Sequence, residues 1–242
     1  MTRVGWFLIN TAQAAFTALW TLFWVPAALV VLCVTCSRRL PLAMARRCWA
    51  PGLLWGARAR LDVRGLENVD FSKPHVFVAN HLSTIDIPVL FRALPANVHF
   101  IIKRELLWVP FVGAYAWAMG MIFVDRADNS KAIANLKRMA HLIRGGRSVI
   151  AFPEGTRSRD GAVLPFKRGA FIAAIEAGVP IVPVAIRGSG QVLPRKGFRV
   201  RPGLIHVVVG KPFPTSHLSA AERAALPQAA REALISALSS LA

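Results

Sequence analysis

The feature that most constrains the fold of this chain is a stretch without charged residues, from Val4 to Ser37. At about 1.5 Å per residue, a continuous helix here would be roughly 50 Å long, whereas the hydrocarbon core of a bilayer is about 30 Å thick. One tilted span would fit, and so would a bent insertion broken near Pro26. The sequence therefore predicts a membrane-associated helical segment and leaves both topologies open.

Arginines and tryptophans follow this stretch closely. The arginines are Arg38, Arg39, Arg46, Arg47, Arg58 and Arg60. Basic residues beside an apolar segment tend to remain in the cytoplasm, so we expect the rest of the chain there. Residues 42–60 alternate apolar residues with arginines and include Trp49 and Trp55, which favours a helix in the membrane interface, interrupted near Pro51 and Gly52. The alternative is an ordinary amphipathic core helix.

The chain is strongly basic, with 30 Lys and Arg against 12 Asp and Glu and a net charge of +18. Such a surface attracts any polyanion, including anionic lipid and nucleic acid. The sequence contains no aromatic RNA-binding motif and no zinc-finger spacing, and its basic residues accompany tryptophans and apolar runs. Cys33 and Cys36 form a C-x-x-C without a second pair, for which we expect simple packing. These observations favour anionic lipid over nucleic acid as the partner.

From about residue 61 the pattern changes to short β-rich runs with helical patterns between several of them. The predicted strands are Leu61–Val63, Val76–Ala79, Val98–Lys103, Met121–Val124, Ser148–Phe152, Ile181–Ile186 and Ile205–Val209. Alternating strands and helices indicate an α/β domain with a largely buried sheet. We therefore predict a membrane-anchoring helical segment over residues 1–60 and an α/β domain over residues 61–242.

Helix boundaries are indicated by capping residues. The clearest predicted helices are Ser130–Arg144, with Ser130 as N-cap, and Gly169–Ala177, closed by Gly178. Ser219 and Glu222 have the spacing of a capping box at the start of a further helix. Pro227 is expected to break or restart that helix.

His81 and Asp86 are the first candidates for chemistry. His81 follows the apolar run Val76–Ala79, and the carboxyl ends of strands are where α/β folds place active sites. A turn followed by a helix, capped by Ser83 or Thr84, would let Asp86 accept a hydrogen bond from one ring nitrogen and leave the other as a base. The alternative is a purely structural pair. Because the sequence lacks a G-x-S-x-G nucleophile motif, we expect His81 to deprotonate a hydroxyl of the substrate itself.

The second candidate region is the loop after the predicted strand Ser148–Phe152. Arg157 can grip a phosphate with two parallel hydrogen bonds, and Gly155 permits an unusual backbone angle or a close approach of substrate. A surface turn containing a salt bridge between Glu154 and Arg157 is the alternative. Further cations near predicted strand ends are Lys103, Arg104, Arg126, Lys167 and Arg168.

Taken in order, these residues resemble a known family, the bacterial 1-acyl-sn-glycerol-3-phosphate acyltransferases of the glycerolipid acyltransferase superfamily. The matching blocks are Asn80-His81-(four residues)-Asp86, Gly120–Arg126, Phe152–Ser158 and Val179–Ile186. Lys103 and the run Phe166–Gly169 also look like signatures of this family. The resemblance covers about residues 61–215 and implies a single α/β domain with a mixed sheet flanked by helices.

The resemblance implies transfer of a fatty acyl group from an acyl-carrier-protein or coenzyme A thioester to the sn-2 hydroxyl of lysophosphatidic acid, which gives phosphatidic acid. It implies His81 as general base and Asp86 as the group that orients it. The residues implied to hold the glycerophosphate are Lys103, Arg126, Glu154, Gly155 and Arg157. No metal or prosthetic group is implied. The expected location is the bacterial inner membrane, with the catalytic domain facing the cytoplasm and anionic phospholipid beneath it.

Three alternatives remain open at this point. The first is an enzyme of the same fold with another acceptor, such as a lyso-ornithine lipid, glycerol 3-phosphate or another lysophospholipid. The second is a basic membrane scaffold or nucleic-acid tether without catalysis. The third is a lipid hydrolase. The ordered motifs favour the acyltransferase over the last two and separate the acceptors poorly.

Overall fold

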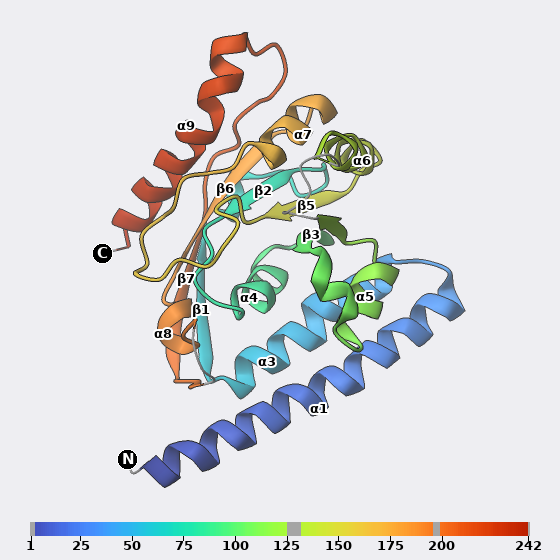
Figure 1. Ribbon diagram of the computed structural model, residues 1–242, viewed down its shortest axis with the longest axis vertical. Coiled ribbons are helices and arrows are strands. Elements are labelled where there is room, and N and C mark those ends of the chain that lie inside the picture. Colours follow the sequence, from blue (N-terminus) through green and yellow to red (C-terminus); the bar gives the residue numbers. More distant parts are fainter. Residues whose placement is uncertain (1–2, 125–131, 196–198, 242) are drawn as a thin grey trace.

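The computed structural model describes residues 3–124, 132–195 and 199–241 of the chain, with a mixed seven-stranded sheet at its centre (Figure 1). The strands are β1 (Ala59–Arg64), β2 (Val76–Ala79), β3 (Val98–Lys103), β4 (Ile122–Val124), β5 (Ser148–Ala151), β6 (Ile181–Arg187) and β7 (Gly203–Val209). Their spatial order is β1-β7-β6-β2-β5-β3-β4. β6, β2, β5, β3 and β4 run parallel, whereas β7 is antiparallel to β6 and parallel to β1. The predicted α/β class with a mixed sheet is confirmed.

Helices cover both faces of the sheet. The α-helices of the domain are α3 (Ala50–Gly56), α4 (Asp86–Ala93), α5 (Val112–Ala118), α6 (Ala132–Arg144), α7 (Gly169–Ala177), α8 (Ser189–Val192) and α9 (Ala220–Ser239). Alternate residues of β2 show how the layers form. Phe77 and Ala79 belong to the core cluster shared with α3, α4 and α5, while Val76 and Val78 belong to the cluster shared with α6, α7 and α9. Because both faces of β2 are buried, its sequence is apolar throughout.

The chain connections that follow the neighbouring strands β2 and β5 run in opposite directions along the sheet. From β2 the chain passes through α4 to β3, which lies beyond β5. From β5 it passes through α7 to β6, which lies on the other side of β2. The two connections leave in opposite directions, and in open α/β sheets ligands bind at the carboxyl ends of the strands where this happens. The loops that begin after Ala79 and Ala151 therefore meet at a site suited to function.

The N-terminal segment forms one long helix, α1 (Arg3–Thr35), which continues through Pro26. It lies along the domain rather than projecting from it (Figure 1). Trp20 Nε1 donates to the carbonyl of Trp49 at 3.0 Å, and Gln13 Nε2 donates to the carbonyl of Gly56 at 2.8 Å. The Trp20 ring occupies the space where a Cβ at Gly52 would lie, so glycine is what allows this close approach.

The two prolines expected to interrupt helices have different effects. The chain is helical from α2 (Arg39–Met44) through a π-helical turn, η1 (Ala45–Trp49), into α3, so regular α-helical bonding is interrupted directly before Pro51. The predicted interruption near Pro51 is thus a π-helical turn and not an end of the helical path. Pro227 lies inside the continuous helix α9 and is buried, so packing against the domain outweighs the lost hydrogen bond. The predicted break at Pro227 is wrong.

The other predicted helices agree with the structure. α7 has the predicted bounds, and Gly178 ends it with a φ of 68°. The Ser219–Glu222 capping box is formed with both of its hydrogen bonds. α6 ends at Arg144 as predicted, and the expected N-cap Ser130 lies outside the described residues. Residues 39–56 also bury one side in the core, where Leu42 and Leu54 are largely inaccessible, as the core-helix alternative predicted.

Shorter one-turn segments complete the described elements. These are the 3-10 turns η2 (Leu66–Asn68) and η3 (Arg104–Trp108). η3 links β3 to α5 and exposes Trp108, and α5 exposes Trp117. Both aromatic side chains therefore face outward from the segment that follows β3.

Acid should destabilise the fold through His99, a buried histidine on β3. Burial, with help from Arg147, lowers the pKa of His99 from its ordinary value to about 4. The unfolded chain then binds more protons than the folded chain between pH 6.5 and 4, so stability is lost as pH falls through this window. We expect His99→Asn to remove about 3 kcal/mol of the decrease in unfolding free energy between pH 7 and pH 4. Denaturant titrations at both pH values measure this, with the exposed His141→Asn as control, and an unchanged decrease in His99→Asn would contradict the assignment.

Candidate active site

His81 lies in the turn between β2 and α4, and the turn brings its ring to Asp86. The distance from His81 Nδ1 to Asp86 Oδ2 is 2.8 Å. An ionised carboxylate can only accept hydrogen bonds, so Nδ1 carries the proton and Nε2 is left as the basic nitrogen. In the described structure Nε2 has no hydrogen-bond partner, and the His81 side chain is 17% exposed. The ring is thus oriented and still accessible.

Asp86 is fully buried at the first position of α4. Its Oδ2 also accepts the backbone N–H groups of Leu82 and Ser83, each at 2.8 Å. These bonds hold the carboxylate in a fixed orientation towards the His81 ring. The Ser83 hydroxyl donates to the carbonyl of Leu193 and accepts the N–H of Ile85 at 3.3 Å, while Ile85 at the N-cap position makes no side-chain bond. Ser83 therefore supports the turn that leads into α4, and it does so from two residues before the N-cap position.

Asn80 fastens the end of β2 to β6. Its side-chain oxygen accepts the N–H of Ile186 and its amide nitrogen donates to the carbonyl of Ile186, both at 2.8 Å. Asn80 is almost completely buried, so both ends of its amide are used. From the sequence, Asn80 was assigned to a motif without a role of its own. A polar amide directly after an apolar strand could have indicated that its side chain bonds to a neighbouring strand.

Phe152 lies against the His81 ring from the end of β5. The ring centroids are 4.0 Å apart and the planes differ by 18°. Phe100 of β3 stacks on Phe152 in turn, with 6.3 Å between centroids. This aromatic series covers one face of the imidazole and connects it to the apolar core. It was not identified from the sequence, because stacking between residues of different strands depends on the sheet order.

Glu154 joins the loop after β2 to the loop after β5. Its Oε1 accepts the N–H of His81 at 2.8 Å, and its Oε2 accepts the N–H of Leu164 at 2.9 Å. A third bond, from Ser158 N to the carbonyl of His81 at 2.8 Å, adds to this connection. Burial raises the pKa of the Glu154 carboxyl, and the two backbone N–H groups oppose that shift. The observed contacts make Glu154 a clamp on the backbone of His81.

Gly155 and Lys167 adjoin this clamp. Gly155 has a φ of 74°, in the region that favours glycine, and a Cβ there would lie 3.0 Å from Lys167 Nζ. The Lys167 backbone N–H donates to the carbonyl of Pro153 at 2.9 Å. The cation of Lys167 is therefore held beside the loop, which the sequence analysis had noted only as one cation among several.

The remaining predicted phosphate-binding residues are placed less directly. Arg157 is half-buried, and its Nη1 donates to the carbonyl of Arg195 at 3.3 Å. Lys103 ends β3, which is separated from β2 by β5, and its Nζ lies 2.6 Å from Glu105 Oε1. Arg126 lies outside the described residues. The structure thus brings together His81, Asp86, Glu154, Gly155 and Arg157, and it sets Lys103 further along the sheet edge. Within the described ranges, no three His, Cys, Asp or Glu residues gather as a metal site would require.

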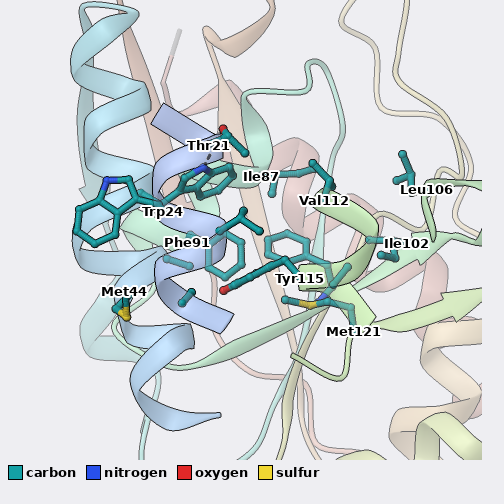
Figure 2. A pocket seen from close by; sticks show the side chains of 16 residues that line it. Thr21, Trp24, Met44, Ile87, Phe91, Ile102, Leu106, Val112, Tyr115 and Met121 are labelled. Atoms are coloured by element: carbon teal, nitrogen blue, oxygen red, sulfur yellow. Dashed lines mark hydrogen bonds between the residues drawn. The ribbon is translucent and has the colours of Figure 1, made fainter. Parts of the chain in front are cut away.

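An apolar cavity adjoins the aromatic series (Figure 2). It has a volume of ≈ 110 Å³ and lies between α1, η1, α4, β3 and α5. Trp24 of α1, Phe91 of α4, Ile102 of β3 and Tyr115 of α5 converge on it in Figure 2. Phe100 lines the cavity and also stacks on Phe152, which stacks on His81. The cavity is thus linked to the imidazole through two aromatic rings.

The class of protein follows from comparison with known families. A family model described as Acyltransferase matches residues 60–187, which include β2, β5 and the whole His81–Asp86 turn. The chain belongs to this acyltransferase family. The motif resemblance found in the sequence is thereby confirmed.

Individual relatives narrow the comparison. The chain is 38% identical over 177 residues to human 1-acyl-sn-glycerol-3-phosphate acyltransferase alpha, covering 73% of this chain and 62% of the relative. It is 39% identical over 156 residues to the chloroplastic 1-acyl-sn-glycerol-3-phosphate acyltransferase BAT2 of Brassica napus, covering 64% and 45%. The crystal structure of the 1-acyl-sn-glycerophosphate (LPA) acyltransferase PlsC from Thermotoga maritima has a TM-score of 0.86 and 26% identity, covering 100% of this chain and 98% of that chain.

Proposed function

We propose that this protein transfers a fatty acyl group from an acyl thioester, acyl-carrier protein or acyl-CoA, to the sn-2 hydroxyl of 1-acylglycerol 3-phosphate, giving phosphatidic acid. The observation that carries this proposal is the His81 Nδ1–Asp86 Oδ2 contact of 2.8 Å, which leaves Nε2 as the base. The relatives named for the same reaction support the choice of substrate.

The proposed step needs no covalent acyl-enzyme intermediate. Nε2 of His81 takes the proton of the sn-2 hydroxyl while the hydroxyl oxygen attacks the thioester carbonyl. The buried Asp86 carboxylate stabilises the imidazolium that forms. When the tetrahedral intermediate collapses, the new C–O ester bond remains, the C–S bond breaks and the thiolate leaves. The imidazolium then returns the proton to the thiolate, which restores the neutral base.

The glycerophosphate would be held by the cations around the second loop. Arg157 and Lys167 lie on that loop and on the segment against it, and Lys103 and Arg126 are the further candidates. Gly155 would give the phosphate access to the backbone. For Glu154 we propose positioning of His81 rather than contact with phosphate, because both carboxylate oxygens already accept backbone N–H groups. No cofactor takes part in this scheme.

The apolar cavity would receive the acyl chain, and its lining would set chain length. Ala116 is buried on α5 and lines the cavity. We expect Ala116→Phe to shift the product towards shorter acyl chains, because the ring would occupy space needed by terminal methylenes. Competition between thioesters of several chain lengths, with product analysis by mass spectrometry, measures the shift. Ala114→Phe, at an exposed position of the same helix, is the matched control, and an unchanged profile in Ala116→Phe would contradict this role.

For the N-terminal segment, residues 1–60, we propose association with one leaflet of a bacterial inner membrane from the cytoplasmic side. Gly5–Thr35 is long and apolar enough to cross a bilayer. However, one side of α1 is bonded to Trp49 and Gly56 of the same segment, which also packs Ala50 and Leu54 into the core of the α/β domain. The opposite side of α1 exposes apolar residues such as Phe7, Leu19 and Phe23. A helix attached along its length to a polar domain fits the interface better than a transverse span. Anionic lipid would bind the basic residues nearby.

Labelling of the two ends of α1 tests this topology. Two single-cysteine variants are used. In the first, Cys33, Cys36 and Cys48 are replaced by serine and Phe7→Cys marks one end of α1. In the second, only Cys33 and Cys48 are replaced, so that Cys36 marks the other end. Flat association predicts that a membrane-impermeant thiol reagent labels neither end in intact cells and both ends after permeabilisation. Labelling of one end in intact cells, with a periplasmic cysteine as positive control, would establish a span instead.

The reaction itself is tested with the purified full chain in liposomes. Lysophosphatidic acid, glycerol 3-phosphate, a lyso-ornithine lipid and other lysophospholipids are each supplied with acyl-CoA and with acyl-carrier-protein thioester. We expect phosphatidic acid as the main product. Activity confined to an acceptor without phosphate would refute the proposed acceptor, and hydrolysis faster than transfer would refute the transferase.

A further inference from the structure

A second cavity, lined by several arginines, opens beside the chain neighbours of His81. It has a volume of ≈ 740 Å³, within the range of roughly 300–1,000 Å³ that small-molecule sites occupy. Asn80 and Leu82, the chain neighbours of His81, line it, as does Ser158, whose N–H bonds to the His81 carbonyl. We call this cavity the arginine groove. The groove therefore adjoins the turn that carries His81.

The arginine groove and the apolar cavity are built from different parts of the fold. The groove is formed by residues 158–163, the end of β6, α8 and the second half of α9. The apolar cavity is formed by α1, η1, α4, β3 and α5. In Figure 1, α8 and α9 lie beside β6 and β7, while α5 lies near the C-terminal end of α1. The groove adjoins His81 through its chain neighbours Asn80 and Leu82, whereas the apolar cavity is linked to His81 through Phe100 and Phe152.

Arginines give the groove its charge. Arg159, Arg187 and Arg195 line it, and within the described part of the chain their guanidinium groups form no hydrogen bond or ion pair. The carboxylate in the groove, Asp160, accepts bonds from Ser158 and Ala162 in its own turn. Three unsatisfied guanidinium groups around one cavity suit a phosphate ligand, because arginine binds phosphate oxygens with its fixed fork of donors.

Arg231 has a different task in the same groove. Its Nε donates to the carbonyls of Val163 and Leu164, and its Nη2 donates to Val163 at 2.6 Å. These bonds attach α9 to the segment that Glu154 also holds through Leu164. The groove wall is therefore fixed to the clamp on His81, so a ligand in the groove would be positioned relative to the base.

We propose that the arginine groove binds the phosphopantetheine arm of the acyl donor, with a donor phosphate on Arg159, Arg187 and Arg195. This inference rests on the proposed acyl transfer. A thioester donor has an apolar chain on one side of the reacting carbonyl and a polar, phosphate-bearing arm on the other. An apolar cavity and a cationic groove, built from different parts of the fold and each linked to the imidazole by adjoining residues, match that arrangement. The arm is common to coenzyme A and acyl-carrier protein, so the groove serves either source.

Donor kinetics test the assignment. We expect Arg187→Ala and Arg195→Ala each to raise the KM for acyl-CoA roughly tenfold, as for loss of a charged hydrogen bond, with the KM for lysophosphatidic acid unchanged. Ala162→Trp, at an exposed position lining the groove, should raise the donor KM by obstruction without removing a charge. Arg144→Ala, an exposed arginine on α6, is the control that removes one positive charge elsewhere. A rise in the KM for lysophosphatidic acid instead would assign the groove to the acceptor and overturn the proposal.

A binding measurement separates this inference from the proposed reaction. Titration calorimetry of the full chain with free coenzyme A, without acceptor, should show binding in the wild type and about tenfold weaker binding in Arg187→Ala. Equal affinity in both proteins would overturn the groove assignment even if transfer is observed, whereas a wild type that forms no product from any donor would refute the reaction. If Arg187→Ala loses activity with both acyl-CoA and acyl-carrier-protein thioester, the ligand of the groove is the phosphopantetheine phosphate that the two donors share. Loss with acyl-CoA alone would exclude the shared arm and overturn the proposal.

Discussion

His81→Ala is expected to lower kcat by about 10²–10⁴-fold, because general-base assistance is removed. The KM for lysophosphatidic acid should change little, since the imidazole acts on the hydroxyl and not on the phosphate. The fold should persist, because the His81 bonds to Glu154 and Ser158 are made by its backbone, which alanine retains. Initial rates of phosphatidic acid formation and circular dichroism of the same samples measure both effects.

Comparing Asp86→Ala with His81→Ala separates a loss of catalysis from a loss of stability. Asp86→Ala leaves the N–H groups of Leu82 and Ser83 without their acceptor, so it should lower both kcat and the unfolding free energy. His81→Ala should lower kcat alone. The exposed His141→Ala serves as the histidine control. Full activity of a folded His81→Ala protein would remove the base from the mechanism.

Glu154→Ala is expected to cost about 2–6 kcal/mol of unfolding free energy, because two buried backbone donors lose their acceptor at about 1–3 kcal/mol each. Glu154→Gln should cost less, since an amide oxygen still accepts one N–H while its NH₂ faces the other. Both variants should also lose transfer activity, because the His81 backbone is no longer fixed. Denaturant titration in detergent and initial rates measure the two losses.

The matched control for Glu154 is Glu176→Ala, at an exposed position on α7. It removes the same charge from the surface and should leave stability and rate close to those of the wild type. If Glu154 contacted the acceptor instead of the backbone, Glu154→Gln would change the KM for the acceptor at unchanged stability. That outcome would restore the phosphate-binding role implied by the family resemblance.

The sequence predicted the β-strands well because each is a short apolar run whose burial leaves little choice of conformation. β2 and β3 have the bounds predicted for them, and the others differ by a few residues at their ends. Helix ends were predictable where a local bond fixes them, as at Gly178 and the Ser219 capping box. Pro227 was misjudged because a proline's local cost was taken as decisive, whereas packing of the surrounding helix compensates it.

By itself the sequence determined the apolar helix, the α/β class and the pairing of His81 with Asp86, because these depend on residue type and short spacing. Only the tertiary structure decided which segments meet at the base. Glu154 lies far from His81 in the chain, and the order of β2 and β5 in the sheet makes it a clamp on the His81 backbone. The aromatic series, the apolar cavity and the arginine groove likewise join residues from several elements. Such contacts follow from strand order and layer packing, which local sequence patterns do not encode.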